Sequence, residues 1–307
     1  MTSARACVLA AMTLALLAAC KKDRPAAVDS VAADSVSVSV PAAPVNPGWQ
    51  TDATGPAMLL AMTDNSAGAL VVLPLMTDSA IAESGAPSLD SMANLEVELF
   101  GRGGFAGSTA LVVGQEQQSS EGCVWWPQAR LAETPPKPWR IGFVRGTAVP
   151  LALDSLESMN AQDSAGVTRE IARLSSIVAE GDDPAFGGLP FSVRRAYRFQ
   201  LSGSTAILAD VVRKISEEAN PRQEHLLLLA ERPASGGQYS AMFDNRVAGS
   251  EETVQTNELL AAVRLVKGGR PTLVISFEYE NGGRVALLQR LSDRQWRVTW
   301  RSAYTGC

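Results

Sequence analysis

The chain has 307 residues, 46% of them hydrophobic, which suffices for one large folded domain or two smaller ones. Its net charge of −5 argues against nucleic-acid binding, because a phosphate-binding surface needs an excess of Lys and Arg. With a single His and four Cys in the whole chain, an ordinary His/Cys metal site is not expected.

The first twenty residues predict export and a lipid anchor. Arg5 is the only charge before Lys21, and the apolar run between them is too short for the roughly twenty residues of a membrane-spanning helix. It has the length of the hydrophobic part of an export signal. The run ends in Leu17-Ala18-Ala19-Cys20, which resembles the lipobox of bacterial lipoproteins. An ordinary secretory signal cut elsewhere is the alternative.

The lipobox resemblance implies a specific modification. In that family the Cys, here Cys20, receives a diacylglyceryl thioether, and the chain is cut in front of it, so residues 1–19 would be a signal peptide. Two or three acyl chains anchor a protein stably in a membrane. Lys21, where some lipoproteins carry a retaining Asp, implies the outer membrane, with the protein facing the periplasm or the cell surface.

Residues 20–47, the lipidated Cys and the segment after it, are expected to form a disordered tether. From residue 21 the segment consists almost only of Ala, Val, Ser, Asp and Pro, which bury too little apolar surface to offset the entropy of ordering. The alternation Val36-Ser37-Val38-Ser39-Val40 allows the alternative of an added edge strand.

The remaining residues predict a strand-rich α+β fold. Apolar and polar residues alternate with period two in several segments, which is typical of half-buried antiparallel strands. We expect an N-terminal α+β part over residues 48–190 and a C-terminal antiparallel β part over residues 191–307. The alternating segments are 95–99, 193–201, 273–280 and 295–302, with Trp296, Val298 and Trp300 sharing one face in the last.

One helix and one hairpin stand out. Apolar residues at helical spacing predict a helix over residues 164–180, capped by Asp163 or Ser164 and ended by Gly181. Asn281-Gly282-Gly283 predicts a three-residue hairpin loop that places Glu280 opposite Arg284.

A weak repeat runs through the last hundred residues. Leu208-Ala209-Asp210-Val211 is echoed by Leu260-Ala261-Ala262-Val263, and Leu226-Leu227-Leu228 by Leu273-Val274-Ile275. Such units resemble propeller blades of the FG-GAP/VCBS type, which implies a partial or small β-propeller. The calcium loop of that family is missing, so no metal site is carried over. A repeated hairpin in an ordinary meander sheet is the favoured interpretation.

The cysteines predict one disulfide. If Cys7 leaves with the signal and Cys20 carries lipid, only Cys123 and Cys307 remain, in a compartment that oxidises thiols. Two unpaired thiols are the alternative.

Four tryptophans form a candidate binding surface: Trp125, Trp126, Trp139 and Trp300. Trp anchors interfaces and stacks on sugars, so an envelope protein or polysaccharide is the expected partner. The alternative is that these residues form the core around the disulfide.

No catalytic motif emerges. Residues 101–106 fit the loosened G-x-G-x-x-A fingerprint, but residues 108–114 predict a strand where that fingerprint needs a helix, so a hairpin turn is expected. His225, the only imidazole, lies at the start of an apolar strand. The acidic pairs Asp182-Asp183 and Glu251-Glu252 allow carboxylate chemistry.

The sequence therefore predicts a lipid-anchored envelope protein that serves as a binding or structural module. Its partners would be the membrane, through Cys20, and an envelope polymer or protein; no cofactor is expected. A carboxylate-dependent hydrolase acting on envelope polysaccharide is the alternative.

Overall fold

The computed structural model describes residues 56–62, 67–74, 76, 78–79, 83, 88–101, 104–114, 123, 126–179, 183–216, 220–266 and 269–307. All of them belong to one compact unit, Asn46–Cys307. Cys20, the tether with Val36–Val40, and Trp125 lie outside the described residues.

A small closed barrel forms the N-terminal part of this unit. Its strands follow the order β1-β2-β5-β4-β3-β6, and every pair is antiparallel. A 3-10 turn, Asp90–Met92, precedes β3. The strands are β1 Met58–Ala61, β2 Gly68–Val72, β3 Glu96–Gly101, β4 Gly104–Val113, β5 Gln128–Leu131 and β6 Ile141–Val144.

Two antiparallel sheets follow the barrel. The central sheet has the order β16-β15-β14-β13-β7, with β17 pairing to β15, and the outer sheet has the order β12-β11-β10-β9-β8. The strands of the central sheet are β7 Ala148–Pro150, β13 Thr256–Leu265, β14 Pro271–Tyr279, β15 Gly282–Ser292, β16 Gln295–Arg301 and β17 Thr305–Gly306. Those of the outer sheet are β8 Asp154–Ser155, β9 Ser192–Leu201, β10 Ser204–Ile215, β11 Arg222–Pro233 and β12 Ser240–Ser250.

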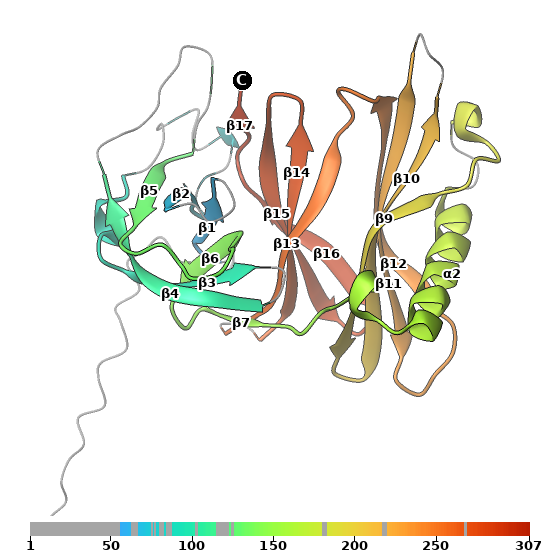
Figure 1. The fold of residues 1–307 in the computed structure, drawn as a ribbon, viewed down its shortest axis with the longest axis horizontal. Coiled ribbons are helices and arrows are strands. Elements are labelled where there is room, and N and C mark those ends of the chain that lie inside the picture. Colours follow the sequence, from blue (N-terminus) through green and yellow to red (C-terminus); the bar gives the residue numbers. More distant parts are fainter. Residues whose placement is uncertain are drawn as a thin grey trace, which may run out of the picture. The chain divides into compact units, whose positions relative to one another are not determined.

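Three apolar clusters define the layers that Figure 1 shows. One joins the barrel to one face of the central sheet, the second fills the space between the two sheets, and the third joins the outer sheet to helix α2, Ala161–Val178. Short 3-10 turns, Leu156–Ser158 and Pro184–Phe186, flank that helix. Because the central sheet is covered on both faces, β14 and β15 carry nearly continuous apolar residues.

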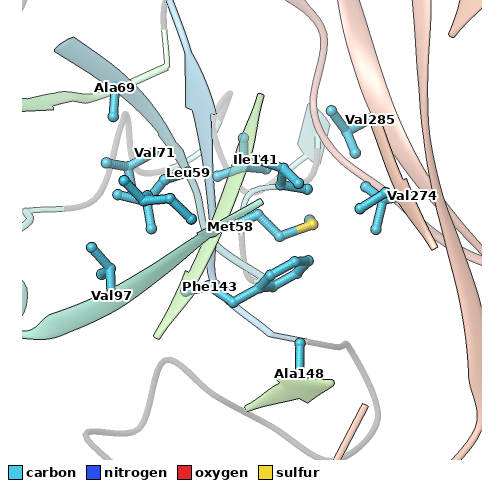
Figure 2. Packing of buried hydrophobic residues seen from close by; sticks show 14 of the residues in the cluster. Met58, Leu59, Ala69, Val71, Val97, Ile141, Phe143, Ala148, Val274 and Val285 are labelled. Carbon is cyan, nitrogen blue, oxygen red and sulfur yellow. The ribbon is translucent and has the colours of Figure 1, made fainter. Parts of the chain in front are cut away.

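The barrel presents its outer surface to the central sheet. Figure 2 shows Met58 and Phe143 pointing from the barrel toward Val274, while Leu59 and Val71 point the other way, into the barrel. This division follows from the alternation of side chains along each barrel strand.

The predicted α+β, strand-rich fold with antiparallel meander sheets is confirmed. The two repeat copies lie in two different four-stranded meanders, β9–β12 and β13–β16, which pack face to face. This arrangement is compatible with the partial propeller as well as with ordinary sheets. The expected division at residue 190 is crossed by strand pairing, because β7 pairs with β13 and β8 with β9.

The predicted helix is confirmed, but its cap is different. Helix α2 begins at Ala161, and its N-cap is Asn160, whose side chain accepts a hydrogen bond from the backbone N–H of Asp163 at 2.9 Å. Asp163 and Ser164 were the expected caps. Asp163 instead lies in the first turn, where its carboxylate binds Arg198. Gly181 lies outside the described residues.

The hairpin between β14 and β15 is confirmed, but the predicted loop and the pairing of Glu280 with Arg284 are wrong. Tyr279 pairs with Gly282, which leaves a two-residue turn, and Arg284 faces Phe277. The glycine lies in the strand because β17 passes beside it: a Cβ on Gly282 would come within 2.0 Å of the Thr305 carbonyl oxygen.

Bulges in β9 and β16 place residues on opposite faces of the sheet, although the alternation in the sequence predicted that they share one face. In β16 the register shifts between Val298 and Trp300, so Trp296 packs between the two sheets, whereas Trp300 joins the barrel cluster on the opposite face. In β9 a shift places Val193 on the side of the helix, away from Tyr197. One extra residue reverses the alternation, because side chains along a strand repeat with period two.

Candidate functional site

A cavity of about 350 Å³ lies where the barrel and the two sheets approach one another. Strand β13 supplies Leu259–Val263, and Tyr197 of β9 completes the wall. The turn between β3 and β4 contributes Phe100, Gly101 and Gly104, and the connection from β7 to β8 contributes Pro150–Leu153. The described part of the wall is therefore made of apolar side chains and backbone, together with Tyr197.

Local backbone features shape this cavity. The register of β13 shifts between Leu259 and Ala261, and this bulge places consecutive apolar residues in the wall. Gly104 has φ +98° and open space at the position of a Cβ, whereas a Cβ on Gly101 would come within 2.5 Å of the Pro138 carbonyl oxygen. Gly101 thus lets the end of β3 pass close to Pro138, in the connection between β5 and β6.

Among the described residues, three with charged side chains lie next to the cavity. Glu258 precedes Leu259 in β13, and its carboxylate accepts a short hydrogen bond from Arg140 and lies 3.5 Å from Nη1 of Arg195. Arg140 is beside the cavity because its backbone N–H donates to the carbonyl oxygen of Phe100. Arg195 lies two residues before Tyr197 on β9. Both arginine side chains are about one third exposed, at 28% and 32%.

The chain matches no protein-family model, no curated protein and no solved structure. Within the described segments, no helix has the length and apolar content needed to span a bilayer. The same segments contain no group of three or more His, Cys, Asp and Glu side chains placed to hold a metal ion.

The two predicted cysteine partners lie at disulfide distance. Sγ of Cys123 and Sγ of Cys307 are 1.98 Å apart, across a sequence separation of 184 residues. Nearby, β17 pairs with β15, and the backbone N–H of Ala303 donates to the carbonyl oxygen of Met76. The chain end is thus joined to the loops beside the barrel.

The described tryptophans of the candidate surface are buried. Trp139 is fully buried in the barrel cluster, and Trp126 and Trp300 are 4% and 8% exposed. Indole Nε1 of Trp126 donates to the carbonyl oxygen of Ala303, and that of Trp300 donates to Pro74. This placement favours the alternative that these residues form the core beside the disulfide.

The glycine-rich segment is a hairpin turn, as expected. Phe100 pairs with Phe105, and Gly101 pairs with Gly104, so β3 continues directly into β4. A helix N-terminus, which a dinucleotide pyrophosphate requires, is absent from this turn because residues 104–113 form a strand.

His225 is a buried structural residue whose hydrogen bonds define its tautomer. Nδ1 lies 3.3 Å from Nη1 of Arg194, and Nε2 lies 3.0 Å from Oε1 of Gln223. A guanidinium only donates, so Nδ1 accepts and Nε2 carries the proton. Nε2 of Gln223 in turn donates to Glu251. Asp210 completes the group, with Oδ2 3.4 Å from Arg194 and Oδ1 4.0 Å from His225.

The described carboxylates of the acidic pairs have structural contacts. Asp183 caps a short turn, and the backbone N–H of Ala185, together with Arg222, holds the pKa of Asp183 below its usual value. Glu251 accepts hydrogen bonds from Gln223 and Lys214. Neither residue lines the cavity, and Asp182 lies outside the described residues.

A buried ion pair between the sheets was not anticipated from the sequence. Both Arg290 and Trp296 donate hydrogen bonds to Glu231, which is fully buried, and Arg290 also donates to Ser204. Burial by itself raises the pKa of Glu231, but these hydrogen bonds and the charge of Arg290 hold it below its usual value. Arg290 is therefore part of the core, and no feature of its strand pattern distinguishes it from the exposed Arg297.

The sequence did not predict that the residues of the cavity come together. The continuous apolar run Leu259–Val263 is a signal of a strand covered on both faces. Nothing in the sequence pairs that run with Phe100 or with Leu151–Leu153, which are more than 100 residues away along the chain.

Proposed function

We propose that this protein is an exported, lipid-anchored module of the bacterial envelope that binds a small apolar ligand. The lipobox-like Leu17-Ala18-Ala19-Cys20 supports the anchor, and Lys21 supports the outer membrane as its location. The single observation that carries the binding role is the cavity between the barrel and the sheets.

The properties of the cavity support binding. Small-molecule sites are concave and mostly apolar, occupy roughly 300–1,000 Å³, and often lie where structural units meet. The cavity of about 350 Å³ falls in that range, and its wall is drawn from the barrel hairpin, the β7–β8 connection and both sheets. A few charged side chains at the border, here Arg140, Arg195 and Glu258, are typical of groups that orient a ligand.

The carboxylates give the hydrolase alternative less support. A general acid in a glycosidase needs a raised pKa, but the pKa values of Asp183 and Glu231 are both lowered. Glu231 is also enclosed between the sheets by Arg290 and Trp296.

The anchor is tested with Cys20→Ser in the full chain. Thioether lipidation needs the thiol, so this variant should lose palmitate labelling and move from the membrane fraction to the soluble envelope fraction. Cys7→Ser is the matched control, since Cys7 lies inside the predicted signal. Unchanged labelling and fractionation of the Cys20 variant would overturn the anchor.

The binding role is tested separately, with the exported Cys20→Ser chain purified without detergent. The dye ANS, an aromatic sulfonate that fluoresces in apolar surroundings, should bind saturably at one site per protein. Leu260→Glu, which puts a charge into the cavity wall, should abolish this binding, whereas Leu291→Glu, on an exposed leucine elsewhere, should not.

A second variant covers the case in which Leu260→Glu does not fold. Ala152 is exposed at the cavity wall, so Ala152→Trp should obstruct the cavity without disturbing the core. Absence of saturable dye binding to the parent chain, or equal binding by the Ala152 variant, would contradict the binding role.

A further inference from the structure

We propose that the cavity takes a single-chain amphiphile that ends in a carboxylate, with the aliphatic chain inside and the carboxylate held by Arg195. This assignment rests on the proposed binding role and names the chemical class of its ligand.

The wall selects an aliphatic chain. Leu153, Leu259, Leu260 and Val263 are among its side chains, and none of the described residues that line it is charged. An ionised group placed inside would lose its hydration without gaining a partner among the described side chains, which strongly disfavours it. Burial of each methylene group is favourable, because its apolar surface leaves water. The interior therefore favours the apolar part of a ligand and leaves a charged end at the border.

In the ion pairs described at the border, guanidinium groups outnumber carboxylates. Arg140 and Arg195 both contact Glu258. Nearby, Oδ2 of Asp210 lies 3.4 Å from Nη1 of Arg194. These described ion pairs thus contain three guanidinium groups and two carboxylates, which favours an anionic end group of the ligand.

Arg195 is better placed than Arg140 to bind the carboxylate of a ligand. Arg140 makes the shorter contact with Glu258, whereas Nη1 of Arg195 lies at 3.5 Å, beyond the usual length of a charge-assisted hydrogen bond. Arg195 also shares a strand face with Tyr197, which lines the cavity. A guanidinium binds a carboxylate through two parallel hydrogen bonds, so Arg195 matches a carboxylate better than a neutral alcohol.

The test compares two ligands of equal chain length, dodecanoate and dodecanol, by displacement of ANS from the exported Cys20→Ser chain. Dodecanoate should displace the dye with one-site behaviour and bind more tightly than dodecanol. Arg195→Gln should weaken dodecanoate binding by at least about tenfold, because both charge-assisted hydrogen bonds to the guanidinium are lost, and leave dodecanol binding unchanged. Arg297→Gln, at an exposed arginine on β16, is the matched control and should change neither.

Each negative result contradicts a different part of the proposal. Failure of dodecanoate to displace a dye that does bind would overturn the ligand class and leave the binding role intact. Equal effects of Arg195→Gln on the acid and the alcohol would overturn the assignment of Arg195. If the parent chain does not bind the dye at all, the binding role itself is overturned. Dodecanoate displacement that survives Ala152→Trp would place the ligand outside the cavity and overturn the proposal.

Discussion

The hydrogen bonds and the burial of His225 give its imidazole a structural role. Oε1 of Gln223 accepts a hydrogen bond from Nε2–H of His225, and Nε2 of Gln223 donates one to Glu251. Arg194 donates a hydrogen bond to Nδ1 of His225. The imidazole is enclosed, at 2% exposure, so it cannot reach a substrate as a general base. It links the ends of β9 and β11 to the connection that follows β12.

Replacing Gln223 by Leu should therefore destabilise the protein. The variant leaves the buried Nε2–H of His225 without an acceptor, which costs about 1–3 kcal/mol. Urea denaturation checks this cost, with Gln238→Leu at an exposed position as the control. Because His225 is the only His in the chain, its ¹⁵N resonances also report the tautomer directly. A protonated Nδ1 in the parent chain would contradict the assignment.

Glu231 predicts a specific acid sensitivity. Its pKa is lower in the folded protein than in the unfolded chain, so its stabilising contribution is complete above the usual glutamate pKa. That contribution is lost as the pH falls through the lowered, folded value. We expect the free energy of unfolding of the parent chain to drop more steeply between pH 7 and pH 3 than that of Glu231→Gln.

Urea midpoints across this pH range provide the measurement. Glu231→Gln should be less stable at pH 7, because it removes the buried counter-charge of Arg290 and leaves only the exposed carboxylate of Asp293. Glu252→Gln, on an exposed carboxylate, should follow the parent chain. Parallel pH profiles for the parent and the Glu231 variant would refute the role of this ion pair.

At the element scale, the cap of helix α2 shows why boundaries are harder to predict than periodicity. Val167, Ile171 and Leu174 are buried against the outer sheet, as their spacing predicts. Several polar residues precede them, and each has a side chain that can cap. Only the entry of the chain from the β8 side selects Asn160.

We expect Asn160→Ala to cost about 1 kcal/mol of stability, because the backbone N–H of Asp163 loses its acceptor. Asn160→Asp preserves an acceptor and should cost much less. Thermal or urea unfolding of the two variants checks the difference. If both behave alike, the cap contributes nothing measurable.

The strand bulges show that side-chain directions are also hard to predict from the sequence. The alternation in Trp296-Arg297-Val298-Thr299-Trp300 is perfect in the sequence, yet the two tryptophans end on opposite faces. A bulge depends on the pairing of a strand with its neighbour, here β15, and the alternation within one strand carries no information about it. Strand positions were therefore predictable, while the direction of individual side chains was not.

At the scale of the whole molecule, the disulfide joins the chain end to the barrel side of the structure. The last residues already contact that region, since the backbone N–H of Tyr304 donates to Asp78 and Trp126 donates to Ala303. The covalent bond closes a loop spanning a sequence separation of 184 residues. Closing so long a loop lowers the entropy of the unfolded chain considerably.

Cys307→Ser should lower the free energy of unfolding by up to about 5 kcal/mol and reduce the melting temperature by several degrees. Cys123→Ser should have the same effect, and the double variant should cost no more than either single one. Mass spectrometry of the unreduced, alkylated protein completes the test. Two alkylatable thiols in the parent chain, or additive losses in the double variant, would rule out the bond.

Patterns within the sequence were enough to predict the strand-rich antiparallel fold, the helix beside the outer sheet and the pairing of Cys123 with Cys307. Periodicity and composition report how each segment meets its surroundings, and the predicted signal and lipid anchor would account for the other two cysteines. The tertiary structure alone decided that the central sheet is covered on both faces, that His225 is enclosed, and that a cavity forms beside Leu259–Val263. These features arise from contacts between segments far apart in the chain, which no local pattern encodes.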